Sequence, residues 1–172
     1  MKKRGIIIKG NFIGSLDGKI VTMERPSNER WQNTNYNGFY RIHVHKVLLL
    51  QLYDGTFGGT IVNFIGTAHD SRLASVLNVD EALSHLDPSF LITGDSAFAT
   101  SPRVVRSLTR EDHSMAPPEL RSNLADCMEI LSILHVSAEW GVGGVENVFH
   151  ILQEPLPADD MCFGSIVWNL SL

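Results

Sequence analysis

The sequence is poor in cysteine and has no long apolar run. Its two cysteines, Cys127 and Cys162, cannot build a disulfide framework, and alone they cannot form a zinc site. The segment 47–50 is among the longest uniformly apolar stretches, far short of the ~18–20 residues that a membrane-spanning helix needs. The first residues also lack the apolar length and the cleavage site of a secretory signal peptide. We therefore expect a protein of a reducing, intracellular compartment.

Positive charge is scarce as well. The chain has 14 Lys and Arg against 19 Asp and Glu, which gives a net charge of -5. A domain that binds DNA tightly by itself is usually basic, so this balance argues against tight unaided DNA binding. Glycine (14) and proline (7) are near their average abundance, which excludes collagen-like and wholly disordered chains. A length of 172 residues with 44% hydrophobic residues predicts one domain with a real core.

The first third of the chain predicts antiparallel strands. The segment 11–23 is rich in β-branched and aromatic residues, which favour a strand. The segment 39–53 alternates at first and then becomes uniformly apolar, which is typical of a strand buried on both faces. The Asp-Gly pair at 54–55 is a strong hairpin signal, and 57–66 supplies the returning strand. The polar segments 29–38 and 100–118 predict loops.

Further along, the pattern changes to mixed elements. Residues 70–77 predict a short helix with Asp70 or Ser71 as its N-cap. Residues 90–92 predict a short buried strand that runs into Gly94, Asp95 and Ser96. Three strands in a meander, a helix, a strand and a long helix then indicate an α/β domain with a mixed central sheet flanked by helices.

The long helix is predicted from apolar residues at helical spacing. These residues are Leu120, Leu124, Cys127, Met128, Leu131 and Leu134. Prolines at 117–118 favour its start, and prolines at 155 and 157 end it. Glycines at 141, 143 and 144 weaken the helix, and we expect them to fray it around Glu146.

Three acidic residues lie where these elements could bring them together. Asp17 is on the first strand, Asp95 ends the short buried strand, and Glu139 is on the long helix. Acids from two strands and one helix are what a two-metal phosphodiester site needs, and carboxylate oxygens suit Mg²⁺ or Mn²⁺. Spacing alone leaves the plainer alternative open, because Asp17 with Gly18 could form a turn and Asp95 could cap a helix.

Several motifs in a fixed order resemble the PIF/Harbinger-type DDE transposases, and more narrowly the fungal members of the DDE superfamily endonuclease domain. The motifs are Leu16-Asp17-Gly18-Lys19, the segment 37–43, Gly66-Thr67-Ala68-His69-Asp70-Ser71-Arg72, Gly94-Asp95-Ser96-Ala97-Phe98, and Ser137-Ala138-Glu139-Trp140-Gly141 closing in Pro155-Leu156-Pro157. The resemblance covers the chain from about residue 14 to residue 157.

This resemblance implies an RNase H-like fold and metal-dependent cleavage and joining of DNA strands. It assigns Asp17, Asp95 and Glu139 as the catalytic acids that hold two divalent cations, Mg²⁺ or Mn²⁺. It makes Asp70, in a His-Asp motif, either a helix cap or an auxiliary metal ligand. No protein nucleophile is expected, because water or a DNA hydroxyl attacks. DNA is the expected partner and the nucleus the expected compartment, with Lys2-Lys3-Arg4 as a weak import signal.

The resemblance also bears on domain organisation. We expect residues 1–157 to form the endonuclease domain and residues 158–172 to form an atypical tail. The family carries a helical DNA-recognition region upstream, whereas Met1 lies only 16 residues before Asp17, so we expect a truncated domain. DNA binding would then be weak and would fall steeply with salt, unless a separate DNA-binding partner protein supplies recognition.

Two alternatives stay open at this point. Glu146 is the second candidate for the third acid, because residues 145–149 resemble the corresponding motif of other Harbinger-type transposases. The second alternative concerns function: a non-catalytic, transposon-derived remnant or a domesticated interaction protein. His135, which stands where the family usually has arginine, and the acidic net charge favour this alternative, whereas the intact three acids favour an enzyme.

Overall fold

The computed structural model describes residues 11–160, 163, 166–167 and 169. The basic segment Lys2-Lys3-Arg4 and Cys162 lie outside the described residues. None of the helices in the described part of the chain is long and apolar enough to cross a membrane.

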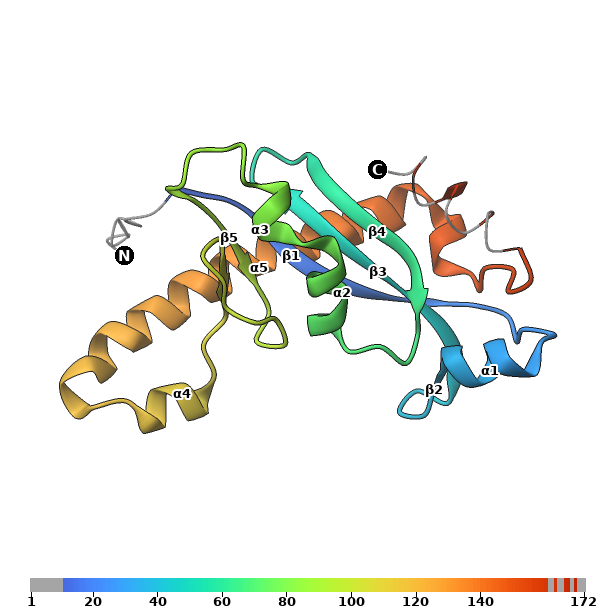
Figure 1. Ribbon diagram of the computed structural model, residues 1–172, viewed down its shortest axis with the longest axis horizontal. Coiled ribbons are helices and arrows are strands. Elements are labelled where there is room, and N and C mark those ends of the chain that lie inside the picture. Colours follow the sequence, from blue (N-terminus) through green and yellow to red (C-terminus); the bar gives the residue numbers. More distant parts are fainter. Residues whose placement is uncertain (1–10, 161–162, 164–165, 168, 170–172) are drawn as a thin grey trace.

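A twisted mixed sheet forms the centre of the molecule (Figure 1). Its strands are β1 (Asn11–Thr22), β2 (Tyr36–Asn37), β3 (Ile42–Leu52), β4 (Phe57–Ile65), β5 (Phe90–Gly94) and β6 (Val104–Arg106). Their order is β2-β3-β1-β5-β6, with β4 paired to β3. Strand β1 is antiparallel to β3 and parallel to β5. Strand β1 therefore lies between the long apolar strand β3 and the short buried strand β5.

Helices flank both faces of this sheet. They are α1 (Glu29–Asn35), α2 (Asp70–Leu77), α3 (Val79–Ala82), α4 (Arg110–Met115) and α5 (Arg121–Val148), with short 3₁₀ turns at Pro118–Leu120 and His150–Gln153. Helices α2 and α3 cover one face, and α5 crosses the other (Figure 1). This arrangement agrees with the expected α/β, RNase H-like fold.

Two hydrophobic cores, one on each face, follow the alternation of side chains along the strands. The core under α2 contains even-numbered strand residues: Leu16, Leu48, Leu50 and Ile92 pack with Leu73 of α2. The core under α5 contains odd-numbered residues of β1 and β3: Val21, Val47 and Leu49 pack with Val142 of α5. From Ser15 onwards on β1 and along β3, the parity of a residue number therefore tells which helix layer its side chain meets.

The prediction of a loop over residues 29–38 is wrong, because a helix begins there. The side chain of Asn28 accepts a hydrogen bond from the backbone N–H of Trp31 at 3.2 Å. Asn28 is therefore the N-cap of α1, and Glu29 adds an acidic residue to its first turn. Asn37, within the segment predicted as a loop, accepts hydrogen bonds from the backbone N–H groups of Phe39 and Tyr40 in the turn that follows the helix.

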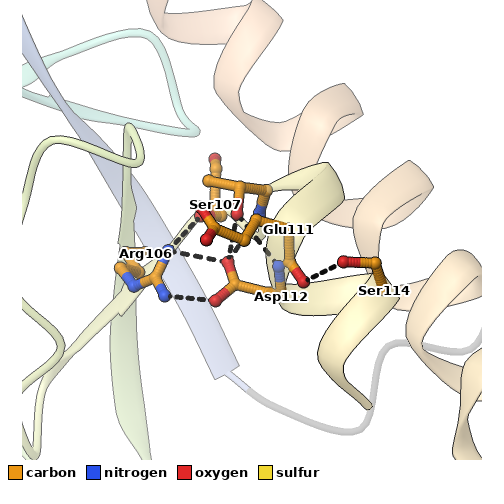
Figure 2. Close-up of polar contacts among 6 residues, drawn as sticks. Arg106, Ser107, Glu111, Asp112 and Ser114 are labelled. Carbon is orange, nitrogen blue, oxygen red and sulfur yellow. Dashed lines mark hydrogen bonds and ion pairs between the residues drawn. The ribbon is translucent and has the colours of Figure 1, made fainter.

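The prediction of a loop over residues 100–118 is also wrong, because this segment contains β6 and α4 (Figure 2). Arg106 on β6 donates two hydrogen bonds to the Asp112 carboxylate, with N–O distances of 2.8 and 3.0 Å. Asp112 also closes a capping box with Thr109. The Arg106 guanidinium, and then Thr109, hold the pKa of Asp112 well below its usual range. These contacts anchor the short helix to the sheet.

Two details of the other predicted helices need correction. The N-cap of α2 is His69, whose ring accepts from the backbone N–H of Ser71, rather than Asp70 or Ser71. Helix α5 runs unbroken to Val148, so the predicted fraying around Glu146 does not occur. Cys127, placed on the predicted apolar side of this helix, is exposed.

Close packing between α5 and the sheet explains one of the helix glycines. A Cβ atom on Gly141 would lie only 1.9 Å from the side-chain nitrogen of Gln51 on β3. Only glycine lets α5 approach β3 this closely without moving that side chain. Gly144, by contrast, has open space where its Cβ would be.

These two glycines predict opposite responses to alanine. Gly144→Ala should raise the free energy of unfolding by about 0.5–1 kcal/mol, because alanine is the better helix former. Gly141→Ala gains the same helix propensity but forces Gln51 away, and overpacking of this kind costs about 1–3 kcal/mol. Urea unfolding of both variants measures the difference, and equal stabilisation by both substitutions would contradict the packing argument.

A buried histidine makes the fold sensitive to acid. His45 on β3 is 5% exposed, and no described atom lies within hydrogen-bonding distance of its Nε2. Burial lowers the pKa of His45 to about 4. The unfolded chain therefore takes up a proton near pH 6.5 that the folded chain refuses until about pH 4.

We predict that stability falls by about 3 kcal/mol between pH 6.5 and pH 4 because of this residue. The contribution is fully present above pH 6.5 and is lost as the pH falls towards the folded-state pKa. Denaturant unfolding at several pH values should show a shallower acid limb for His45→Leu. The exposed His85 provides the control, since His85→Leu should leave the acid limb unchanged. An equal change in both variants would contradict the assignment.

Candidate active site

Two of the three predicted acids lie side by side at the centre of the sheet. Strands β1 and β5 run parallel, and Leu16 pairs with Gly94. Asp17 follows Leu16 on one strand and Asp95 follows Gly94 on the other, so both aspartates come directly after the same residue pair. Asp95 follows the last residue of β5, which leaves its side chain exposed.

Asp17 belongs to the face of β1 that α5 covers. Ser15, two residues before it, lies 3.5 Å from the ring nitrogen Nδ1 of His135 on α5. Lys19, two residues after it, forms an ion pair of 3.0 Å with Glu146 on the same helix. Since side chains alternate along a strand, Asp17 points to α5 between these two contacts. On the helix, Glu139 likewise lies between His135 and Glu146.

The charges of the other two acids act on Asp17. Burial raises the pKa of Asp17, and the nearby His135 and the backbone N–H of Gly18 oppose that rise. The negative charges of Glu139 and Asp95 raise the pKa of Asp17 further. The structure thus brings Asp17, Asp95 and Glu139 within electrostatic reach of one another, from two strands and one helix.

Glu139 stands at the solvent side of this group. Its side chain is 58% exposed, and one carboxylate oxygen lies 3.8 Å from Nε2 of His135, one helical turn earlier. The carboxylate of Asp95 accepts a hydrogen bond from the backbone N–H of Ser96. Asp17 is therefore the enclosed member of the group, and the other two acids are open to a large ligand.

Glu146, the second candidate for the third acid, has a different partner. Its carboxylate is 3.0 Å from the ammonium group of Lys19 and largely shielded from solvent. The charge of Glu139 raises the pKa of Asp17. Glu146 is instead held by Lys19.

Asp70, predicted as a helix cap or an auxiliary ligand, lies on the opposite face of the sheet. A Cβ atom on Gly18 would lie 3.2–3.4 Å from the Asp70 carboxyl group, and Gly18 points away from the face used by Asp17. Asp70 forms a 2.7 Å ion pair with Lys46 on β3. The structure does not bring Asp70 to the other three acids.

Two lysines neutralise the acids outside the proposed set: Lys19 pairs with Glu146, and Lys46 pairs with Asp70. Lys19 follows Asp17 by two positions, a spacing that on a strand implies a shared face, so this signal was available. Lys46 is a single polar residue at the edge of an apolar run. Its pairing with Asp70 depends on how β3 lies beneath α2, and the sequence does not carry that information.

The donor set fits a hard divalent cation in its chemistry. Carboxylate oxygens are the preferred ligands of Mg²⁺ and Mn²⁺, and a cation would relieve the repulsion that raises the pKa of Asp17. Across residues 11–160 and the described positions beyond, however, no three His, Cys, Asp or Glu side chains come close enough to hold a metal ion. The three acids interact electrostatically, but among the described residues they do not form a complete set of metal ligands.

Comparison with known proteins identifies the family. A family model described as DDE superfamily endonuclease matches residues 16–167. This range includes all three acids and extends ten residues beyond the predicted domain boundary at residue 157. No curated protein and no solved structure matches the chain. Since the matched range covers most of the sequence, the chain belongs to the DDE superfamily of endonucleases.

Proposed function

We propose that this chain is a divalent-metal-dependent DNA endonuclease domain of the transposase type, with Asp17, Asp95 and Glu139 as its catalytic acids. The pairing of Leu16 with Gly94 carries this proposal, because it sets two acids side by side under the helix that bears the third. On its sequence motifs, we assign the chain to the PIF/Harbinger type.

The proposed cofactor is Mg²⁺ or Mn²⁺. Asp17, Asp95 and Glu139 would hold the ions, which would supply activation of the attacking oxygen and stabilisation of the leaving one. Asp70 is left out of this set because Lys46 engages it on the other face of the sheet. Binding would require the exposed side chains of Asp95 and Glu139 to turn towards Asp17, and their exposure leaves room for that movement.

The protein's own residues would orient the DNA rather than attack it. Ser15 is the hydroxyl-bearing residue nearest to Asp17 on the same face of β1, but it is fully buried. It therefore cannot reach a phosphate, and water or a DNA hydroxyl is the attacking group in this proposal. His135 lies between Ser15 and Glu139 and would restrict the rotamers of that glutamate.

Recognition of DNA by this chain alone is proposed to be weak. The net charge of -5 gives little general attraction for phosphates, so binding would depend strongly on salt. A separate DNA-binding partner protein would then supply target choice. We propose the nucleus as the site of action, on the ground that the substrate is DNA.

A second candidate function is a non-catalytic remnant of a transposase. The lack of three converging ligands among the described residues favours this candidate, as does histidine at position 135. The two candidates differ in one measurable property, which is metal-dependent cleavage of DNA.

The decisive measurement is nicking of supercoiled plasmid in the presence of Mn²⁺. The wild-type chain should nick, and Asp95→Asn and Glu139→Gln should each lose at least about 100-fold in rate, because each removes a ligand worth several kcal/mol in the transition state. The matched controls are Asp70→Asn and Glu146→Gln, which should keep a rate close to wild type.

Each unexpected outcome has a definite meaning. A wild-type chain without Mn²⁺-dependent nicking would support the remnant. Loss of nicking in Glu146→Gln with retention in Glu139→Gln would move the third acid to Glu146. Loss in Asp70→Asn would restore Asp70 as an auxiliary ligand.

The raised pKa of Asp17 predicts a conflict between stability and function. Because folding raises this pKa, the associated stability is present below the unfolded-state pKa and is lost as the pH rises through the folded-state value. At pH 7 the ionised carboxylate therefore opposes folding. Without metal, Asp17→Asn should melt at a higher temperature than wild type at pH 7, whereas Asp95→Asn, which alters an exposed side chain, should not.

Adding Mn²⁺ should reverse this order. At ten times the dissociation constant the wild-type chain gains about 1.4 kcal/mol, or about 3–6 °C in melting temperature. Neither Asp17→Asn nor Asp95→Asn should respond. A melting temperature of Asp17→Asn below that of wild type without metal would refute the electrostatic argument, whatever the result with Mn²⁺.

A further inference from the structure

The turn between β2 and β3 exposes three aromatic side chains. Phe39 is 86% exposed, Tyr40 54% and Tyr36 45%. The rings of Phe39 and Tyr40 meet edge to face, with their centroids 4.9 Å apart. A cluster of exposed apolar side chains of this kind often marks an interaction site.

This turn is held rigidly from inside. The side-chain oxygen of Asn37 accepts hydrogen bonds from the backbone N–H groups of Phe39 and Tyr40, at 3.0 and 3.2 Å. The carbonyl oxygen of Asn37 accepts from the N–H of Arg41 at 2.8 Å. Arg41 takes a left-handed backbone conformation, with φ of 59°. A preformed turn presents its rings to a ligand with little further loss of conformational entropy.

The root of the turn is fixed as well. The side chain of Asn35 is buried, donates to the carbonyl oxygen of Trp31 and accepts from the N–H of Gly66. Thr67 donates both its N–H and its hydroxyl to the carbonyl oxygen of Thr34. These contacts tie α1 and the turn to the loop that precedes α2.

The charge around this turn differs from that of the whole chain. Residues 30–53 contain no Asp or Glu but include Arg30, Arg41 and Lys46, in a protein of net charge -5. Arg30 and Arg41 are exposed. A cavity of about 340 Å³ adjoins the turn, lined among others by Tyr36, Lys46 and His69. Exposed rings beside basic and hydrogen-bonding groups are what a nucleic acid strand needs, with bases on the rings and phosphates near the cations.

The position of the turn relative to the acids is set by strand register. Asp17 pairs with Leu49 of β3, and Asn37 pairs with Ile42 of the same strand. Seven residues of β3 separate these levels, or about 24 Å at ~3.4 Å per residue. Strand β1 continues beyond the level of Asp95, where β5 ends, and the turn lies further along in that direction.

We propose that the β2–β3 turn, residues 36–41, binds unpaired bases of a DNA strand by stacking on Phe39 and Tyr40, while a phosphate further along the same strand lies at the acids. This inference rests on the proposed function, since it describes how the same DNA substrate is held. Unpaired bases are the ligand because their ring faces are free, whereas in a duplex those faces are covered by neighbouring base pairs. The exposed Arg30 and Arg41 serve the phosphates of the same strand, since Lys46 is already paired with Asp70.

Fluorescence anisotropy with a labelled oligothymidylate of about 20 nucleotides, at low salt and without divalent metal, tests this proposal. The double substitution Phe39→Ala with Tyr40→Ala should weaken binding about tenfold or more, because stacking contributes about that much for each base. Phe39→Trp with Tyr40→Phe should retain binding. The control is Met115→Ala on α4, since Met115 is also apolar and 76% exposed; it should bind like wild type.

All these side chains are exposed, so the variants should keep the wild-type melting temperature, and a circular dichroism scan checks this. Equal affinity of the double alanine variant and wild type would overturn the proposal, and so would an equal loss in Met115→Ala. Binding of the same sequence as a duplex, more tightly than the single strand and without dependence on Phe39 and Tyr40, would also overturn it.

The test separates this inference from the catalytic proposal. Asp95→Asn should lose nicking, while its binding of the oligonucleotide should still depend on Phe39 and Tyr40. If the wild-type chain does not nick plasmid but its single-strand binding depends on the two rings, the catalytic proposal fails and the stacking site stands. If nicking depends on Asp95 while the double alanine variant both binds and nicks like wild type, the stacking site fails alone.

Discussion

The parallel pairing of β1 with β5 is the constraint on which the rest of the site depends. Because Leu16 is opposite Gly94, the next residue on each strand is an aspartate, and the two carboxylates follow the same rung. A shift of one residue would turn Asp17 to the face of α2, where Gly18 now makes room for Asp70. The cores on the two faces hold this register, since the same slip would expose Leu16 on one side and bury polar side chains on the other.

The position of Asp17 is electrostatically unfavourable, and the surrounding residues reduce the repulsion. Asp17 is buried beside two other acids, and its pKa is raised as a result. His135 opposes the rise, while Lys19 neutralises Glu146 at one side of the site. On the other face, Lys46 neutralises Asp70 in the same way. Glu146 and Asp70 are thus neutralised by lysines of the protein itself. In our proposal, Asp17, Asp95 and Glu139 are neutralised by a bound cation instead.

Sequence patterns were sufficient for the sheet and the long helix but not for the contacts between layers. The apolar run of β3 and the helical spacing of α5 predicted both elements, whereas the assignment of the three acids from the ordered motifs stays a prediction. The capping box at Thr109 and Asp112 was visible in the sequence and could have revealed α4. The pairing of Lys46 with Asp70 was not visible, because it depends on the register of β3 and the position of α2. Glycines 141, 143 and 144 misled, because helix propensity predicts fraying, whereas packing decides the outcome in a helix held against a sheet.

The contact between Gly141 and Gln51 also bears on how such a site can change through evolution. Gly141 lies two residues after Glu139, and Gln51 is directly opposite Ser15 on the neighbouring strand. An added side chain at position 141 would therefore displace the end of the Gln51 side chain, an uncharged group beside the acids. A larger residue at position 141 would be accommodated most easily by a smaller residue at position 51. The two positions should accordingly vary together among descendants of this sequence, while each acid can stay unchanged.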